Sequence, residues 1–142
     1  EAFQQKARTG QTLDRTAATL LAVLATGRLP EGSVTAEEFD DPQLRALCEG
    51  LLAGDNPAAL MEEQTDDRSR ELASQVLAIP VADDDETLLR MARECLYHMR
   101  RQRLEARVEQ IEKEIPNLPP QARSDREREL FQLSQRLTEL KP

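Results

Sequence analysis

Two apolar stripes in the last third of the chain constrain its fold more than any other feature. In each stripe, aliphatic residues recur at intervals of three or four, so they share one face of an α-helix and leave the other faces to charged residues. The first stripe contains Leu104, Val108, Ile111 and Ile115, and the second contains Leu130, Leu133, Leu137 and Leu140. Between them, residues 116–120 (PNLPP) stop the first helix and turn the chain. The pattern predicts an antiparallel helical hairpin at the C-terminal end.

The remaining sequence is also typical of helices, because Leu and Ala supply its apolar mass among Glu, Arg and Gln. The predicted fold class is all-α: a helical bundle followed by a long helix and a C-terminal antiparallel helical hairpin. We expect a linker remnant at 1–11, the bundle subdomain at 12–100 and the hairpin subdomain at 101–142. The chain opens at Glu1 rather than Met, so we expect a fragment of a longer protein. No segment is long and apolar enough to cross a membrane.

Capping signals predict where the helices begin and end. A first helix is expected over 12–27, and Asp41-Pro42 and Asn56-Pro57 each place a polar cap before a proline at the first helical position. Another helix covers 68–79, and a long one follows the acidic run 83–86 and continues to Ile115. The capping box at 124–127 (SDRE) predicts the start of the last helix. Inward-facing side chains are expected at Leu44, Leu47, Cys48, Leu51 and Leu52, at Leu72, Val76, Leu77 and Ile79, and at Leu89, Ala92, Leu96 and Met99.

The hairpin has too little apolar surface to be stable alone. Eight stripe residues contribute roughly 2 kcal/mol each when buried, while ordering about forty residues costs several times the sum. We therefore expect a loosely docked hairpin that is completed by a partner.

The formal net charge of −8 is unevenly distributed. Residues 1–97 hold 9 basic and 19 acidic side chains, a balance of −10, whereas residues 98–142 hold 10 basic and 8 acidic, a balance of +2. The acidic part repels nucleic acid, so strong direct nucleic-acid binding is not expected. A polyanion would have to use the stretch containing Arg100, Arg101, Arg103 and Arg107, but the preferred interpretation of these arginines is a solvated helix face.

No constellation of residues indicates catalysis or a metal. Cys95 and His98 have a spacing that can chelate a metal, but Cys48 is distant and no fourth ligand is evident, which favours packed thiols in a reducing cytoplasm. There is no glycine-rich phosphate loop, no nucleophile motif around the single histidine and no calcium-loop pattern. We therefore predict a fragment that is not an enzyme and has no catalytic residues, no metal site and no cofactor.

Phe131 is the candidate interface residue outside the stripes. It is offset by about 100° from Leu130 and cannot fully share its face. Two interpretations remain open: an anchor for a partner protein, or a plug at the edge of the hairpin.

Three segments resemble the C-terminal helicase-binding domain of bacterial DnaG-type primase. They are TAEEFDDPQLRALCEGLLAG (35–54), NPAALMEE (56–63) and DDETLLRMARECLYHMRRQRLEARVEQIEKEI (84–115). The resemblance covers 12–142 and consists of a phenylalanine, an Asp-Pro helix start, a Leu-rich helix and a long helix with clustered arginines before a terminal hairpin. The proline-rich turn and the end at Pro142 depart from the pattern.

The resemblance implies a domain that docks on the N-terminal domains of the hexameric replicative helicase in the bacterial cytoplasm. The contact implied by the family falls on Leu130, Phe131, Ser134, Arg136, Leu137 and Lys141. A single-stranded-DNA-binding protein stays open as a further partner. Three alternatives also remain: the N-terminal helical domain of the replicative helicase itself, a nucleic-acid-binding regulator and a generic helical scaffold.

Overall fold

The computed structural model of the chain describes residues 14–63 and 66–142. Over these residues the regular secondary structure is entirely helical, with no strand, so the predicted all-α fold is confirmed. The segment 1–11, expected to be a linker, and Leu13, expected on the first helix, lie outside the described residues. The elements are α2 (Arg15–Ala25), η1 (Ala36–Glu38), α3 (Pro42–Leu52), α4 (Pro57–Glu63), α5 (Asp67–Leu77), α6 (Asp85–Glu114), η2 (Ile115–Asn117) and α7 (Pro120–Glu139).

The chain divides into two compact units within α6. Unit 1 is Glu1–Cys95 and unit 2 is Leu96–Pro142. The boundary expected from the sequence, at residue 100, lies in the same helix.

Polar caps begin the short helices of unit 1 where the sequence predicts them. The Asp41 carboxylate accepts a hydrogen bond of 2.8 Å from the Gln43 N–H, and Pro42 occupies the first turn of α3. At α4, the Asn56 side-chain oxygen accepts a bond of 2.8 Å from the Ala58 N–H. Both devices satisfy backbone donors that have no partner inside the helix.

The core of unit 1 is formed by α2, α3, α4 and α5 together with the first turns of α6. α2 packs on α3 and α5, and α4 packs on α3 and α5. The largest fully buried side chains of this unit are Phe39, Leu20, Leu21, Leu88, Val23 and Cys48. Arg28 connects the loop after α2 to the start of α6, because its guanidinium lies 2.7 Å from the Asp85 carboxylate and donates to the Asp83 carbonyl.

Two inward-facing predictions are wrong, and a third is displaced by one residue. Leu52 and Leu77 are 46% and 38% exposed, because each is the last residue of its helix and the neighbouring helices do not cover that position. On α6 the fully buried leucine is Leu88, while Leu89 is only half-buried. The stripe on this helix therefore starts one residue earlier than expected and continues correctly through Ala92, Leu96 and Met99.

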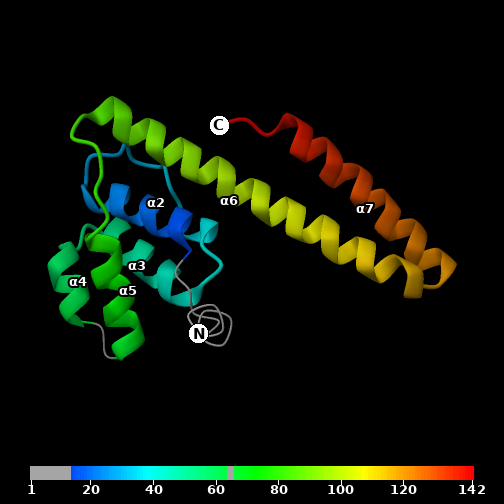
Figure 1. Ribbon diagram of the computed structural model, residues 1–142, viewed down its shortest axis with the longest axis horizontal. Coiled ribbons are helices and arrows are strands. Elements are labelled where there is room, and N and C mark those ends of the chain that lie inside the picture. Colours follow the sequence, from blue (N-terminus) through cyan, green and yellow to red (C-terminus); the bar gives the residue numbers. More distant parts are fainter. Residues whose placement is uncertain (1–13, 64–65) are drawn as a thin grey trace, which may run out of the picture. The chain divides into compact units, whose positions relative to one another are not determined.

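Unit 2 consists of the later part of α6, the η2 turn and α7, which runs back antiparallel to that part of α6 (Figure 1). Ile111 and Leu133 are buried, and the other six stripe residues are half-buried. We call the apolar side of α7 that carries Leu133 the seam.

The last helix begins earlier than predicted. α7 starts at Pro120, and Ser124 lies inside it, so the capping box at 124–127 is not used. Proline is well suited to the first helical position because its fixed φ fits the helix and its missing N–H would have had no partner there. Pro119, in an extended conformation, provides the turn into the helix.

Candidate protein-interaction surface on helix α7

Phe131 lies on the side of α7 opposite the seam. It is separated from Leu133 by two residues, which corresponds to about 160° around a helix. Its side chain is 65% exposed, the largest exposure among the large apolar residues described. Phe131 is therefore not buried as a plug at the hairpin edge. Its interpretation as an anchor for a partner protein stays a prediction.

Short polar side chains form a shallow hollow beside Phe131. The hollow has a volume of about 310 Å³ and is lined by Phe131, Ser134, Gln135, Thr138 and Glu139. The Thr138 hydroxyl donates to the Ser134 carbonyl at 3.0 Å, so it is turned back onto its own helix. We call this strip the outer face of α7. An exposed aromatic ring bordered by polar side chains matches the apolar centre and polar rim of a protein interface.

The six predicted contact residues do not form one surface in the structure. Leu130 and Leu137 are half-buried on the seam side, whereas Phe131 and Ser134 share the outer face. Lys141 is exposed beyond the end of α7.

Arg136, the sixth predicted residue, lines a different hollow of about 320 Å³. Its other lining residues are Asp125, Arg128, Glu129, Gln132 and Leu133. Of the six predicted residues, only Phe131 and Ser134 line the hollow on the outer face. The additional outer-face residues are Gln135, Thr138 and Glu139. Gln135 and Thr138 follow Phe131 at i+4 and i+7, a helical spacing that can be found from the sequence.

A charged cluster connects α7 to the later part of α6. Arg107 donates two hydrogen bonds to the Glu129 carboxylate, at 2.8 Å and 3.1 Å, which is the bidentate geometry of a strong ion pair. Arg126 lies 3.3 Å from Glu129 and 3.6 Å from Glu114. The Arg107 guanidinium holds the pKa of the Glu129 carboxyl below its ordinary value. We call Arg107, Glu114, Arg126 and Glu129 the charged cluster.

The arginine-rich stretch considered for polyanion binding is partly neutralised within the chain. Arg101 pairs with Glu105 at 3.0 Å and donates to the Tyr97 hydroxyl at 3.1 Å, and Arg107 belongs to the charged cluster. A nucleic-acid phosphate would have to displace these carboxylates, so the solvated-face interpretation fits the geometry better.

Both cysteines are buried in unit 1. Cys48 is fully buried and Cys95 is 9% exposed. Burial, with a smaller contribution from the neighbouring Glu49 and Glu94 respectively, raises the pKa of each thiol to about 11. The thiols are therefore protonated at neutral pH and are poor nucleophiles and metal ligands.

His98 is exposed in unit 2, and its ring lies edge-on to Tyr97, with centroids 5.2 Å apart. In the part of the chain that the structure describes, no three His, Cys, Asp or Glu side chains are grouped so that they could hold a metal ion. Among residues 14–63 and 66–142, no helix combines the length and apolar character that crossing a membrane requires.

The chain matches no protein-family model, no curated protein and no solved structure.

Proposed function

We propose that this chain is a helicase-binding domain of the bacterial DnaG-type primase kind, which recruits primase to the replicative helicase at the replication fork. The observation that carries the proposal is the exposed Phe131 on the outer face of α7. Aromatic side chains, Phe among them, are enriched in protein interfaces.

The composition of unit 2 supports a role in binding. Four apolar side chains are buried among its described residues, namely Leu96, Met99, Ile111 and Leu133. A unit with so small an apolar core gains stability when a partner covers more of its surface. The partner implied by the sequence resemblance is the N-terminal part of the hexameric helicase, formed by its N-terminal domains.

The mechanism is recruitment by tethering. A domain that binds the helicase holds the covalently linked polymerase activity close to the newly unwound template and so raises its effective concentration there. Primer synthesis belongs to a catalytic core outside this sequence, and this fragment contributes no catalytic residue or cofactor. Binding also gives the domain a means to modulate the helicase and primer synthesis.

The alternatives predict different binding behaviour. An N-terminal domain of the helicase itself would associate with copies of the same domain, and a generic scaffold would show no preference for the helicase. A single-stranded-DNA-binding protein stays a further candidate partner, to be tested separately.

The test is calorimetric titration of the 142-residue chain into a bacterial hexameric replicative helicase, with Phe131→Ala beside the unmodified chain. We expect Phe131→Ala to weaken binding about thirtyfold, which corresponds to about 2 kcal/mol. Its thermal unfolding should be unchanged, because the ring is mostly in solvent.

Leu52→Ala is the matched control, since it removes an exposed apolar side chain from unit 1 and should leave helicase binding unchanged. Absence of binding by the unmodified chain would contradict the proposal. Equal binding by Phe131→Ala would retain the helicase as partner but place the contact elsewhere.

A further inference from the structure

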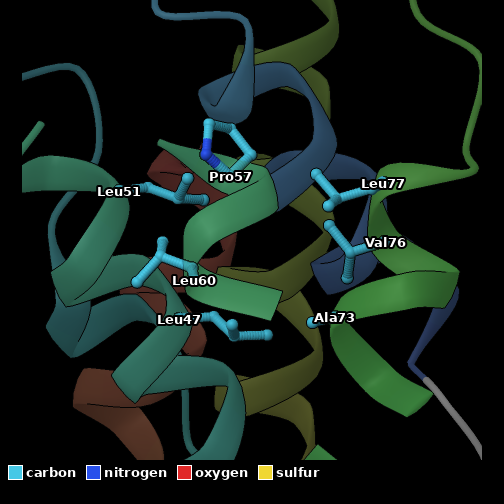
Figure 2. Close-up of a pocket in the computed structure, with 7 residues that line it drawn as sticks. All are labelled: Leu47, Leu51, Pro57, Leu60, Ala73, Val76 and Leu77. Carbon is cyan, nitrogen blue, oxygen red and sulfur yellow. The ribbon is translucent and has the colours of Figure 1, made fainter. Parts of the chain in front are cut away.

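The aliphatic contacts between α3, α4 and α5 in unit 1 leave almost no free space (Figure 2). The volume left among the lining side chains is about 10 Å³, which is about what one water molecule needs. Leu47, Leu60 and Val76, which line this space, are buried. This part of unit 1 is therefore packed core, unlike the open hollows along α7.

The second hollow on α7 lies beside the outer face. Its volume is about 320 Å³, and its lining consists of Asp125, Arg128, Glu129, Gln132, Leu133 and Arg136. Arg128, Gln132 and Arg136 follow one another at intervals of four residues, so they form one strip along the helix. We call these three residues the donor strip. It lies about 60–140° from Phe131 around the helix, so one partner surface can cover both.

Arg128 and Arg136 have no ion-pair partner in the part of the chain that the structure describes. Other arginines of unit 2 are paired with glutamates of the same chain, namely Arg101, Arg107 and Arg126. Arg136 acts on Glu129 only through a longer-range attraction, which helps to lower the pKa of that carboxyl. The two arginines that line the hollow thus keep their guanidinium groups available to a partner.

The carboxylates of the hollow do not cancel this positive charge. Glu129 accepts two hydrogen bonds from Arg107 and lies 3.3 Å from Arg126, so its charge is already compensated in the charged cluster. Asp125 is the remaining carboxylate in the lining, against two guanidinium groups. Unit 2 also has an excess of basic side chains, 10 against 8 acidic. The hollow therefore has a positive balance, which favours an acidic partner.

We propose that the donor strip contacts carboxylates of the partner that covers the outer face of α7. A guanidinium group binds a carboxylate through two parallel hydrogen bonds, and the Gln132 amide can donate another. The two arginines lie eight residues apart, about 12 Å along the helix, so they fit acidic residues two turns apart on a partner helix. The inference rests on the proposed function and adds the chemistry of the partner: an acidic helical surface beside the site that receives Phe131.

Nucleic acid is the less favoured occupant of the donor strip. Phosphate groups also accept hydrogen bonds from arginine, but unit 1 has 9 basic and 19 acidic side chains, a balance of −10. A long polyanion is repelled by this charge, whereas a short acidic segment of a protein reaches the strip alone.

The first experiment does not need the helicase. The arginine Nε–H groups of the whole 142-residue chain are isotope-labelled, and the probe is a synthetic helical peptide of leucine and glutamate. The same peptide with lysine in place of glutamate and a single-stranded oligonucleotide are the comparison probes. We expect the glutamate peptide to shift the signals of Arg128 and Arg136, to leave that of Arg93 in unit 1 unchanged, and to bind more weakly in added salt. The lysine peptide should shift none of them.

The second experiment repeats the helicase titration with variants that each neutralise one charge. Arg128→Gln and Arg136→Gln should each weaken binding about fivefold, mainly by slowing association. Asp125→Asn, in the same hollow, should strengthen it, because a charge that repels the partner is removed. Arg93→Gln in unit 1 is the matched control and should change nothing. All four side chains are exposed, so the variants should keep the fold.

Three results would overturn the proposal. The first is an equal shift of Arg128 and Arg136 by the lysine peptide. The second is a shift by the oligonucleotide without one by the glutamate peptide, which would assign the strip to phosphate. The third is weaker helicase binding by Asp125→Asn, which would indicate a structural role for the hollow. A chain that binds the glutamate peptide but not the helicase would contradict the proposed function and leave the acidic chemistry of the partner supported.

Discussion

Units 1 and 2 are stabilised by different means. Among the described residues, unit 1 buries eighteen apolar side chains and unit 2 buries four. Unit 2 adds the charged cluster, in which Arg107 makes two bonds to Glu129. Unit 1 thus has the larger hydrophobic contribution, while unit 2 combines a few apolar contacts with ion pairs at the surface.

This difference indicates that the two units can open separately. Local opening follows the number of buried apolar contacts, so elements with few of them exchange their amide hydrogens sooner. The exposed aromatic surface proposed for binding lies on the less stabilised unit, where partner binding can add stability without opposing a rigid core.

The largest expected effect comes from removing a fully buried side chain in each unit. Leu21→Ala in unit 1 and Ile111→Ala in unit 2 should each cost about 2–5 kcal/mol, because the side chains are fully buried and leave cavities. Hydrogen exchange should show that Ile111→Ala removes protection from unit 2 while α2 and α3 stay protected. Equal loss of protection in both units would show that they unfold together and would contradict the inference that they open separately.

A smaller effect is expected from the cap of α3. Asp41→Ala removes the bond to the Gln43 N–H and the pair with Arg68, and should lower the stability of unit 1 by about 1 kcal/mol. Asp41→Asn is the control, since its side-chain oxygen still caps the helix. Thermal denaturation that places Asp41→Asn as low as Asp41→Ala would assign the effect to the ion pair instead of the cap.

The smallest effect is expected from protonation of Glu129. Its pKa is lowered from the ordinary 4.5, mainly by the hydrogen bonds from Arg107. The stabilisation is therefore complete above the ordinary value and is lost as the pH falls through the lower folded-state pKa. Because both side chains are about one-third exposed, the contribution is reduced by solvent screening.

Glu129→Gln isolates this contribution. In unit 1 the pKa of Asp41 is also lowered: burial raises it, but the Gln43 N–H and Arg68 outweigh burial, so both units lose stability in acid. Amide exchange in unit 2 should depend less on pH in Glu129→Gln than in the unmodified chain, with unit 1 unaffected. An unchanged pH profile in unit 2 would exclude Glu129 as the group responsible.

Helix caps could be predicted from the sequence, whereas the burial of side chains at the ends of helices could not. Asp41-Pro42 and Asn56-Pro57 begin helices as expected, because a cap depends on residues within one turn. Leu52 and Leu77 were expected to be buried from their periodicity alone. Whether the last residue of a helix is covered depends on which helix crosses it, and the sequence contains no local signal for that.

The start of α7 illustrates a competition between two local signals. Both Pro120 and the box at 124–127 can begin a helix, and the proline that comes first in the chain does so. Helix periodicity places Phe131 away from the apolar stripe of α7. Its exposure depends on which side of α7 faces α6, and the sequence contains no local signal for that.

Chemical labelling of the two buried cysteines can report the opening of unit 1. A buried thiol with a pKa of about 11 reacts slowly with an alkylating reagent until the surrounding helices separate. The labelling rates of Cys48 and Cys95 therefore count the openings of unit 1. Unit 2 has no cysteine, so its openings are not labelled and the reagent reports on unit 1 alone.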